Sequence, residues 1–513
     1  MLAKPADHRN RFPMATTLGL LADVVIFIVA LRAGLGVSLA HIVSFAGATL
    51  VAGVGGVYRD ADQWGVGGRD GGGGKPWING YGRWLAIALA VLFLRGGVLA
   101  LCLGWGMRTE VAILAAAVVT AALMRAATSL VSWRSLAVGL VVCVALLRLI
   151  YSSQVELLPE ETYYWNYSRH LDLGYLDHPP MVAWLIHAGT TLFGETAFGI
   201  RSGAIVCSAI ASVYVYRLTR DLFDDDSALV ALVFMQALPF FFFSGLMMTP
   251  DVPLTAAWAA LLYYLEQALI RGRASAWWRA GLGLGLGLHS IYTFRMLAPV
   301  AVIFMVWDSQ SRRWLRHWLP YASLVLALAI FSPVIYWNAT HEWASLAFQT
   351  SRRLAESPRF SLHKLILSAL VLLTPVGAVG LVATLWGKQN DPAELLRRRR
   401  FMQFSVLLPL AVFFVFSLRH EVKLDWTGTL WIAALPVLAS VVRETDATGV
   451  RAWTRSAWPP TLAILLLIYG AALHYLVLGL PGVGYGSHME LVPVGWRDLG
   501  RQVSAIRNEV RVA

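Results

Sequence analysis

Residues 159–184 read PEETYYWNYSRHLDLGYLDHPPMVAW and separate two long apolar segments of the chain. Two adjacent acids, Glu160 and Glu161, follow directly after an apolar run; aromatic residues come next, and Asp177 and His178 precede a double proline. A charged side chain at a membrane border is costly unless it is solvated or used. The stretch therefore indicates a functional site, with a solvated loop carrying interfacial aromatic residues as the structural alternative.

The composition around this stretch is that of a membrane protein. Of the 513 residues, 58% are hydrophobic and 14% are charged, whereas a soluble globular protein has about 25% charged residues. A soluble enzyme and a disordered chain are both excluded, and we expect an all-α polytopic membrane protein. The net charge of +12 predicts basic cytoplasmic loops rather than a nucleic-acid partner.

Apolar runs of about 20 residues, the length needed to cross a bilayer, predict about fifteen transmembrane helices. Basic residues alternate between the loops as the positive-inside rule requires if the N-terminus is cytoplasmic; the run Arg397 to Arg400 is then a cytoplasmic loop. Two of the spans, 279–291 and 295–307, are short. The predicted spans are 15–33, 36–57, 84–104, 109–128, 135–151, 200–218, 228–247, 252–270, 279–291, 295–307, 318–337, 361–386, 403–418, 427–442 and 458–480.

Two long segments, 152–199 and 338–360, fall on the predicted outer face, where binding and chemistry tend to lie. A glycine-rich loop is expected at 59–83. With a composition change near residue 130, the pattern predicts three regions. They are a four-span region at 1–130, a membrane domain at 131–480 and an outer tail at 481–513.

Polar residues from several separated segments converge on this outer face. Single arginines there are often interfacial side chains that extend to water, but their convergence with carboxylates is typical of general-base catalysis beside a cationic phosphate site. The further candidates, apart from those at 159–184, are Asp251, Arg295, Arg352, Lys423 and Asp425, with His341 in the second long segment.

Residues 159–184 resemble the first outer loop of the polytopic GT-C glycosyltransferases. The likeness is to bacterial members of the protein O-mannosyltransferase and lipid A aminoarabinose transferase group. Later pieces match the pattern in order, and the resemblance covers roughly 135–513. These pieces are Thr249-Pro250-Asp251, Trp337-Asn338, His341-Glu342-Trp343 and Glu421-Val422-Lys423 with Trp426.

The resemblance implies roles for these residues. Members usually open the loop with an Asp-Glu pair, and here Glu160 replaces the Asp, so we expect Glu161 to be the catalytic base, with Glu160 or Asp177 assisting. Ile291 stands where many relatives have lysine, so this phosphate contact is either missing here or supplied by Arg295. The expected donor-phosphate and substrate-binding residues are His178, Asp251, Arg295, Arg352, Lys423, Tyr163 and Tyr175.

Residues 12–130 resemble, less specifically, the four-span GtrA-like proteins associated with polyprenyl-linked sugars, through Asp23 and the 39–58 span. A structural extension is the alternative. The likeness predicts a separable donor-handling module, so that residues 135–513 would suffice for catalysis.

The family resemblance implies an inverting glycosyltransferase of the bacterial inner membrane with periplasmic catalytic loops. Its donor would be a polyprenyl-phosphate-linked sugar and its acceptor an envelope glycolipid such as lipid A or its core, a polysaccharide or a protein. The rival functions are a flippase or transporter for lipid-linked sugars and an oligosaccharide ligase. No cofactor is required by the scheme and no metal site is expected; a divalent metal held by Asp177, His178 and His341 is the alternative.

Overall fold

The computed structural model describes residues 11–52, 76–127, 132–352, 357–385, 392–444, 447–479 and 494–512, and its regular elements within these ranges are all helices. This confirms the all-α fold. The compact packing divides the chain into two units, residues 1–158 with 463–513 and residues 159–462. The boundary falls within the long helix α20 (Gly449–Leu478).

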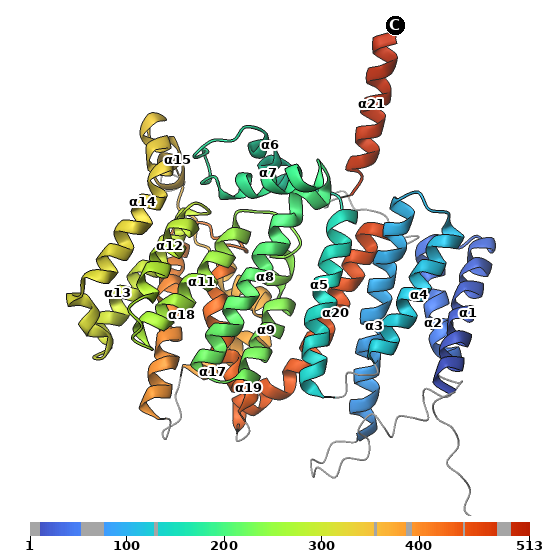
Figure 1. The fold of residues 1–513 in the computed structure, drawn as a ribbon, viewed down its shortest axis with the longest axis horizontal. Helices are drawn as coiled ribbons and strands as arrows, with labels where there is room; N and C mark the ends of the chain where they lie inside the picture. The colour runs from blue at the N-terminus through green and yellow to red at the C-terminus, as the bar shows by residue number, and fades with distance from the viewer. Residues whose placement is uncertain are drawn as a thin grey trace, which may run out of the picture. The chain divides into compact units, whose positions relative to one another are not determined.

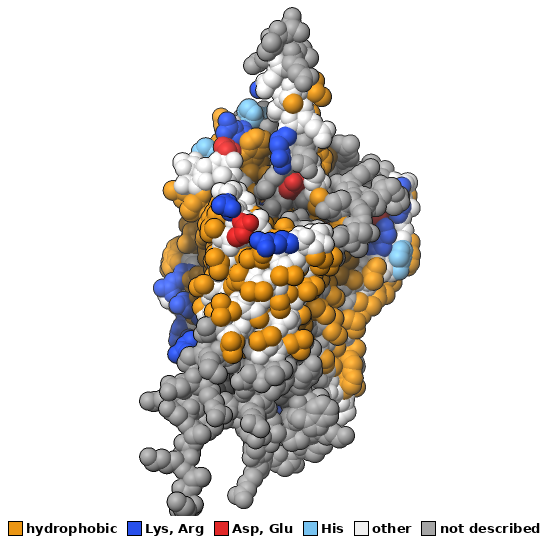
Figure 2. All heavy atoms as spheres, turned by 90° about the vertical axis from the view of Figure 1, so that its right-hand side faces the viewer, with side chains coloured by type: hydrophobic (Ala, Val, Ile, Leu, Met, Phe, Trp, Pro, Cys, Tyr) orange, Lys and Arg blue, Asp and Glu red, His pale blue; other side chains and the backbone are white. Residues whose placement is uncertain are grey.

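Unit 1 consists of the first five helices, the C-terminal half of α20 and the C-terminal helix (Figure 1). Helix α1 packs on α2, and α3 packs on α4 and α5. Figure 2 shows an apolar band on one face of this unit, with charged side chains at its upper border, as expected for helices that face lipid. The helices are α1 (Arg11–Arg32), α2 (Val37–Ala52), α3 (Pro76–Gly104), α4 (Thr109–Ala127), α5 (Trp133–Gln154) and α21 (Trp496–Val512).

A polar cluster lies in the interior of unit 1. The guanidinium of Arg95 donates to Asp23 at 2.7 Å, to Ser44 at 3.0 Å and to a ring nitrogen of His41. His41 stacks on His474 of α20, with ring centroids 5.3 Å apart, and all these side chains are buried. Charges in such a place are retained only when paired. The cluster joins three of the first four helices to the last span.

The compact units do not follow the predicted boundaries at 130 and 480. Tyr151 of α5 donates to the carbonyl of Phe93 in α3 at 2.9 Å. A Cβ added at Gly470 of α20 would lie 1.9 Å from the Phe93 ring, so α20 approaches α3 as closely as a glycine allows. The first four helices thus share their packing with α5 and α20. Of the predicted loop 59–83, residues 59–75 lie outside the described residues, and 76–83 belong to α3.

Unit 2 contains the remaining helices. Helices α8 and α11 pack together, α11 and α14 pack on α12, and α19 packs on α9. Helices α6, α7 and α15 lie at one end of this bundle (Figure 1). The long helices are α8 (Ala197–Leu222), α11 (Asp251–Leu269), α14 (Trp318–Thr340) and α18 (Ala393–Ser417). The shorter ones are α6 (Pro159–Arg169), α7 (Met181–Phe193), α9 (Asp225–Ala237), α10 (Pro239–Ser244), α12 (Ala276–Leu288), η3 (Tyr292–Met296), α13 (Leu297–Trp307), η4 (Ser311–Arg316), α15 (Ala344–Ala347), η5 (Phe348–Arg352), α16 (Leu362–Leu372), α17 (Thr374–Thr384), η6 (Thr429–Ala434) and α19 (Leu435–Arg443).

The predicted count of about fifteen spans is not confirmed. Among the described residues, seven helices are long and apolar enough to cross a membrane, or eight if the bent pair α16 and α17 is one span. That pair, predicted as one helix at 361–386, bends by 102° where Pro375 follows Thr374, whose φ is +65°. Several predicted spans are short helices, such as α12 and α13 on either side of η3.

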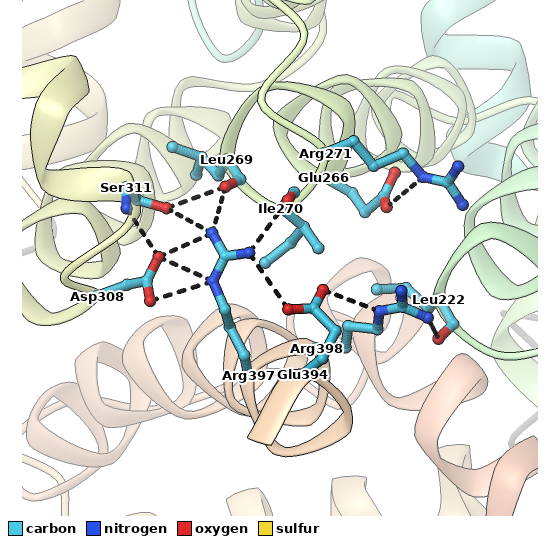
Figure 3. Close-up of polar contacts among 10 residues, drawn as sticks. All are labelled: Leu222, Glu266, Leu269, Ile270, Arg271, Asp308, Ser311, Glu394, Arg397 and Arg398. Atoms are coloured by element: carbon cyan, nitrogen blue, oxygen red, sulfur yellow. Dashed lines mark hydrogen bonds and ion pairs between the residues drawn. The ribbon is translucent and has the colours of Figure 1, made fainter. Parts of the chain in front are cut away.

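The basic run at 397–400 belongs to helix α18 instead of a loop. Arg397 is buried and binds Asp308 through Nε and Nη2, at 3.0 and 2.9 Å, and its Nη atoms donate to the carbonyls of Leu269 and Ile270 (Figure 3). These carbonyls belong to the C-terminal end of α11, which has no further turn to satisfy them. Arg397 therefore ties α18 to the ends of α11 and α13, at the end of unit 2 opposite α6 (Figure 1).

Candidate active site

Helix α6 supplies the two adjacent acids. Pro159 opens the helix, where its fixed φ and missing N–H suit the first position, and Glu160 and Glu161 lie in its first turn, where the helix dipole favours carboxylates. Neighbouring residues of an α-helix project about 100° apart. One acid therefore faces the bundle and the other faces away: Glu161 is fully buried and Glu160 is exposed.

Glu161 is held by an ion pair inside unit 2. Arg201 of α8 donates to both of its carboxylate oxygens, Nε to Oε1 at 2.8 Å and Nη2 to Oε2 at 2.6 Å. The backbone N–H of Met248 donates to Oε1 at 3.0 Å. Both side chains of the pair have zero exposure. Glu161 is thus already bound to a cation and shielded from solvent. Its contacts are those of a carboxylate that fastens α6 to α8 and to the segment between α10 and α11.

Glu160 lies among other acidic groups. Its pKa is raised above the ordinary range, first because neighbouring protein atoms partly desolvate it and then because Asp425 repels its charge; Lys423 and a hydrogen bond with Tyr164 act in the opposite direction. Asp251, which precedes the apolar part of α11, has its pKa raised to about 8 by burial and by the charges of Asp425 and Glu160. The three carboxyl groups therefore share one electrostatic environment, although each pair of them is at least 91 residues apart in the sequence.

The turn that carries Lys423 and Asp425 is fastened to α16. Ser361 donates through Oγ to the carbonyl of His420 at 2.6 Å and accepts from the N–H of Val422 at 3.1 Å. Ser368 donates to the carbonyl of Leu424 at 2.6 Å. These bonds hold the backbone on both sides of Lys423 while its side chain and that of Asp425 remain exposed.

Asp177 is held by aromatic residues of α6. The hydroxyl of Tyr167 donates to its carboxylate at 2.7 Å, and Tyr167 also bonds to Tyr163 and stacks on Tyr175 with centroids 4.1 Å apart. The ring of His178 lies edge-on to Tyr164 at 5.8 Å. The sequence-predicted residues Glu160, Tyr163, Asp177 and Tyr175 are therefore brought together on or against one short helix.

The second long segment contacts the first through α14 and the turn after it. Trp337 donates through Nε1 to Asp172 at 2.8 Å, and its ring lies against Gly174, where a Cβ would lie 2.8 Å from it. Gln349 bonds to the backbone carbonyl of Asp177. Only a glycine fits at position 174, and this contact holds the loop between α6 and α7 against α14.

The predicted cations have different positions. Arg295 is an exposed residue of η3, an element linked to the second segment by the hydrogen bond between Tyr292 and Ser345 at 2.9 Å. Within the described part of the chain neither Arg295 nor Lys423 forms an ion pair within 4 Å, so both are available to an anion. Arg352 closes the π-helical turn η5, and its side chain lies outside the described residues.

A metal site does not form among the described residues, which contain no group of three or more His, Cys, Asp or Glu side chains that could hold an ion. Asp177, His178 and His341 do not make one. The ring of His341 instead stacks on Trp337 with centroids 4.2 Å apart.

Sequence analysis missed two parts of this site. Arg201 was not singled out, yet a lone arginine near the start of the apolar run 200–218 is itself a signal, because a charge in such a run requires a partner. Tyr164 and Tyr167 were read only as part of an aromatic group. Their hydrogen bonds to Glu160 and Asp177 depend on the rotation of α6 and are not visible in the sequence.

Part of unit 2 matches a known protein family. Residues 177–337 match the family model described as dolichyl-phosphate-mannose-protein mannosyltransferase. That segment is a domain of this GT-C family. It contains Asp177, Asp251, Arg295 and Trp337, and it begins just after the two acids of α6.

Curated relatives carry consistent names. The chain is 28% identical over 204 residues to an undecaprenyl phosphate-alpha-4-amino-4-deoxy-L-arabinose arabinosyl transferase of Pseudomonas paraeruginosa, with 36% of each chain covered. It is 30% identical over 188 residues to the lipid A galacturonosyltransferase RgtD of Rhizobium johnstonii, covering 36% of this chain and 38% of the relative. The lipopolysaccharide core galacturonosyltransferase RgtA of the same organism is 24% identical over 378 residues. This match covers 69% of this chain and 73% of RgtA. The matches to the first two thus span little more than a third of those relatives.

Among solved structures, ArnT of Cupriavidus metallidurans bound to undecaprenyl phosphate aligns with a TM-score of 0.53 at 16% identity, covering 73% of this chain and 80% of ArnT. At this identity the likeness shows the fold, which is the GT-C fold of ArnT. The fold expectation and the family resemblance are therefore confirmed, whereas the GtrA-like region is not and stays a prediction.

Proposed function

We propose that this protein is an inverting glycosyltransferase that moves one sugar from a polyprenyl-phosphate donor to an envelope acceptor. The observation that carries the proposal is the grouping of an exposed carboxylate, Glu160, with the cation Lys423 at the end of unit 2 that bears α6 and α7. A glycosyl transfer from a lipid phosphate needs these two groups, a base for the acceptor and a cation for the leaving phosphate.

In the proposed reaction Glu160 takes the proton of an acceptor hydroxyl as its oxygen attacks the anomeric carbon. The bond between this carbon and the phosphate oxygen breaks from the opposite face, through an oxocarbenium-like state. The negative charge that gathers on the departing polyprenyl phosphate is stabilised by Lys423 and Arg295, with Arg352 as a further candidate. The scheme requires no metal.

We assign the base to Glu160 rather than to Glu161, which the family pattern favoured. A base must reach the acceptor proton and be free to accept it; the buried pair with Arg201 supports a positioning role for Glu161 instead. Asp251, with a pKa near 8, would be largely protonated at neutral pH and would donate a hydrogen bond to a sugar hydroxyl. Tyr163, Tyr175, Asp177 and His178 would line the substrate side of α6.

The proposed setting is the bacterial inner membrane, with the N-terminus cytoplasmic and the α6 end periplasmic. The arginines that gather at the opposite end of unit 2, among them Arg271, Arg397 and Arg398 (Figure 3), support a periplasmic α6 end because cytoplasmic ends carry the basic excess. The names of the relatives support lipid A or the lipopolysaccharide core as acceptor. The polysaccharide and protein acceptors remain as alternatives for the assay.

Mass spectrometry of envelope glycolipids from a deletion strain tests the proposal. Loss of a single-sugar increment from a glycolipid, restored by the wild-type protein and not by Glu160→Gln, is the expected result. Loss of a whole preassembled glycan would identify a ligase. Unchanged glycolipid structures together with accumulation of donor on one face of the membrane would identify a transporter.

A further inference from the structure

The C-terminal helix α21 has an apolar stripe that stays exposed among the residues that the structure describes. Trp496, Leu499, Val503 and Ile506 are spaced three or four residues apart and lie within about 80° on a helical projection. Their exposed fractions are 48, 50, 56 and 59%. Large apolar side chains aligned in this way are expected to be buried against lipid or another protein surface, because their exposure to water is unfavourable.

The remainder of the helix surface carries basic and small residues. Arg501, Ser504 and Ala505 project away from the stripe, and Arg507 lies beside it; all four are exposed. A narrow apolar face beside basic residues is typical of helices that lie in the plane of a membrane surface, where the arginines meet anionic headgroups.

The start of α21 is fixed at the level of a membrane border. The backbone N–H of Trp496 donates to the carboxylate of Glu156 at 2.6 Å. Glu156 follows two residues after Gln154, which ends the span α5. Tryptophan is enriched at this depth, so the first residue of the stripe already lies where headgroups begin.

Figure 1 draws α21 pointing away from the ends of the unit 1 spans; we propose that in the bilayer it turns at Trp496 onto the membrane surface, with its stripe inserted among the lipids and its arginines at anionic headgroups. The occupant that covers the stripe is thus an anionic phospholipid layer. The lipid is next to Trp496 because α5 ends there, whereas a protein partner would have to be recruited. This helix would fasten the C-terminal end of the chain to the bilayer beside α5.

The test uses the full-length protein in vesicles and compares spin labels at two nearby positions on opposite faces. Val503→Cys places the label in the stripe, and Ala505→Cys, about 160° away around the helix, is the matched control. Both are made in a background that carries Cys102→Ala, Cys143→Ala and Cys207→Ala. Collisions of each label with oxygen, which dissolves in lipid, and with a water-soluble nickel complex are measured in vesicles of phosphatidylcholine with and without phosphatidylglycerol.

The expected result in vesicles with phosphatidylglycerol is loss of nickel collisions at position 503 with oxygen collisions retained, while position 505 stays open to nickel. Leu499→Cys should behave like Val503→Cys, which guards against a local effect of one label. Shielding of position 503 from both reagents would mean that protein covers the stripe, and equal nickel access at 503 and 505 would mean that the helix lies in water. Either result overturns the proposal. The same shielding in vesicles of phosphatidylcholine alone would overturn the proposal that the arginines bind anionic headgroups.

Discussion

Replacing the two acids of α6 one at a time distinguishes the proposed base from its neighbour. Glu160→Gln removes an exposed carboxylate, so we expect folding to be nearly unaffected and turnover to fall by about 100- to 10,000-fold, the usual contribution of a general base. Glu161→Gln removes the charge that balances the buried guanidinium of Arg201. Breaking a buried pair on one side typically costs about 3–5 kcal/mol, so this variant should lose stability.

A double variant separates stability from catalysis. Glu161→Gln combined with Arg201→Met removes both charges, keeps an amide oxygen that can accept from the N–H of Met248, and retains most of the side-chain volume. Neutral replacements of a buried pair are often close to neutral in stability, so we expect the double variant to regain most of the lost stability and most of the activity.

The assay measures thermal unfolding of each purified variant in detergent and, at a temperature where all are folded, donor-dependent sugar transfer per folded molecule. The account is contradicted if Glu160→Gln transfers sugar at nearly the normal rate while the double variant, fully folded, is inactive. That result would return the base to Glu161.

Three further predictions follow from the charges of the site and of unit 1. Because Asp425 raises the pKa of Glu160, Asp425→Asn should move the acid limb of the pH–rate profile to lower pH; the base must be ionised, so activity is lost as the pH falls through this pKa. Lys423→Met should weaken donor binding by about 1.5–3 kcal/mol, the range for a hydrogen bond to a charged group. Asp23→Leu should destabilise the protein by about 3–5 kcal/mol by leaving Arg95 unpaired, and adding Arg95→Leu should recover part of the loss.

Each of these predictions has an outcome that would contradict it, and the donor-binding prediction also has a control variant. Arg169→Gln changes an exposed cation of α6 that is already paired with Glu195, and it should leave donor affinity unchanged; equal weakening by Arg169→Gln and Lys423→Met would remove the phosphate role of Lys423. If the acid limb of the pH–rate profile is unchanged in Asp425→Asn, Glu160 is not the group whose ionisation sets that limb. For the third, full stability of Asp23→Leu would mean that the buried pair contributes nothing.

The packing of unit 1 also bears on the predicted separability of residues 1–130. A chain starting near Ser132 would remove α3, against which Tyr151 and Gly470 pack. We therefore expect it to aggregate in detergent. A monodisperse, active protein of this kind would instead support the separable module.

The sequence predicted the helical membrane fold and the segments that form the site, because composition and apolar run length report directly on lipid exposure. It could not rank Glu160 and Glu161, since the ranking depends on which face of α6 meets α8, and this face is chosen by Arg201, 40 residues away. Hydropathy likewise counts the apolar residues at 361–386 as one span. Hydropathy does not detect the 102° bend at Thr374, because the bend depends on backbone geometry.

The central claim is that the protein transfers a single sugar from a lipid phosphate to an envelope glycolipid. Its most direct test combines the purified protein with synthetic undecaprenyl-phosphate sugars and lipid A or core acceptors, with the products identified by mass spectrometry. The account predicts an acceptor heavier by one sugar and one undecaprenyl phosphate released per transfer, both absent with Glu160→Gln. Donors that remain intact with every acceptor, while the folded protein moves them across vesicle membranes, would contradict it.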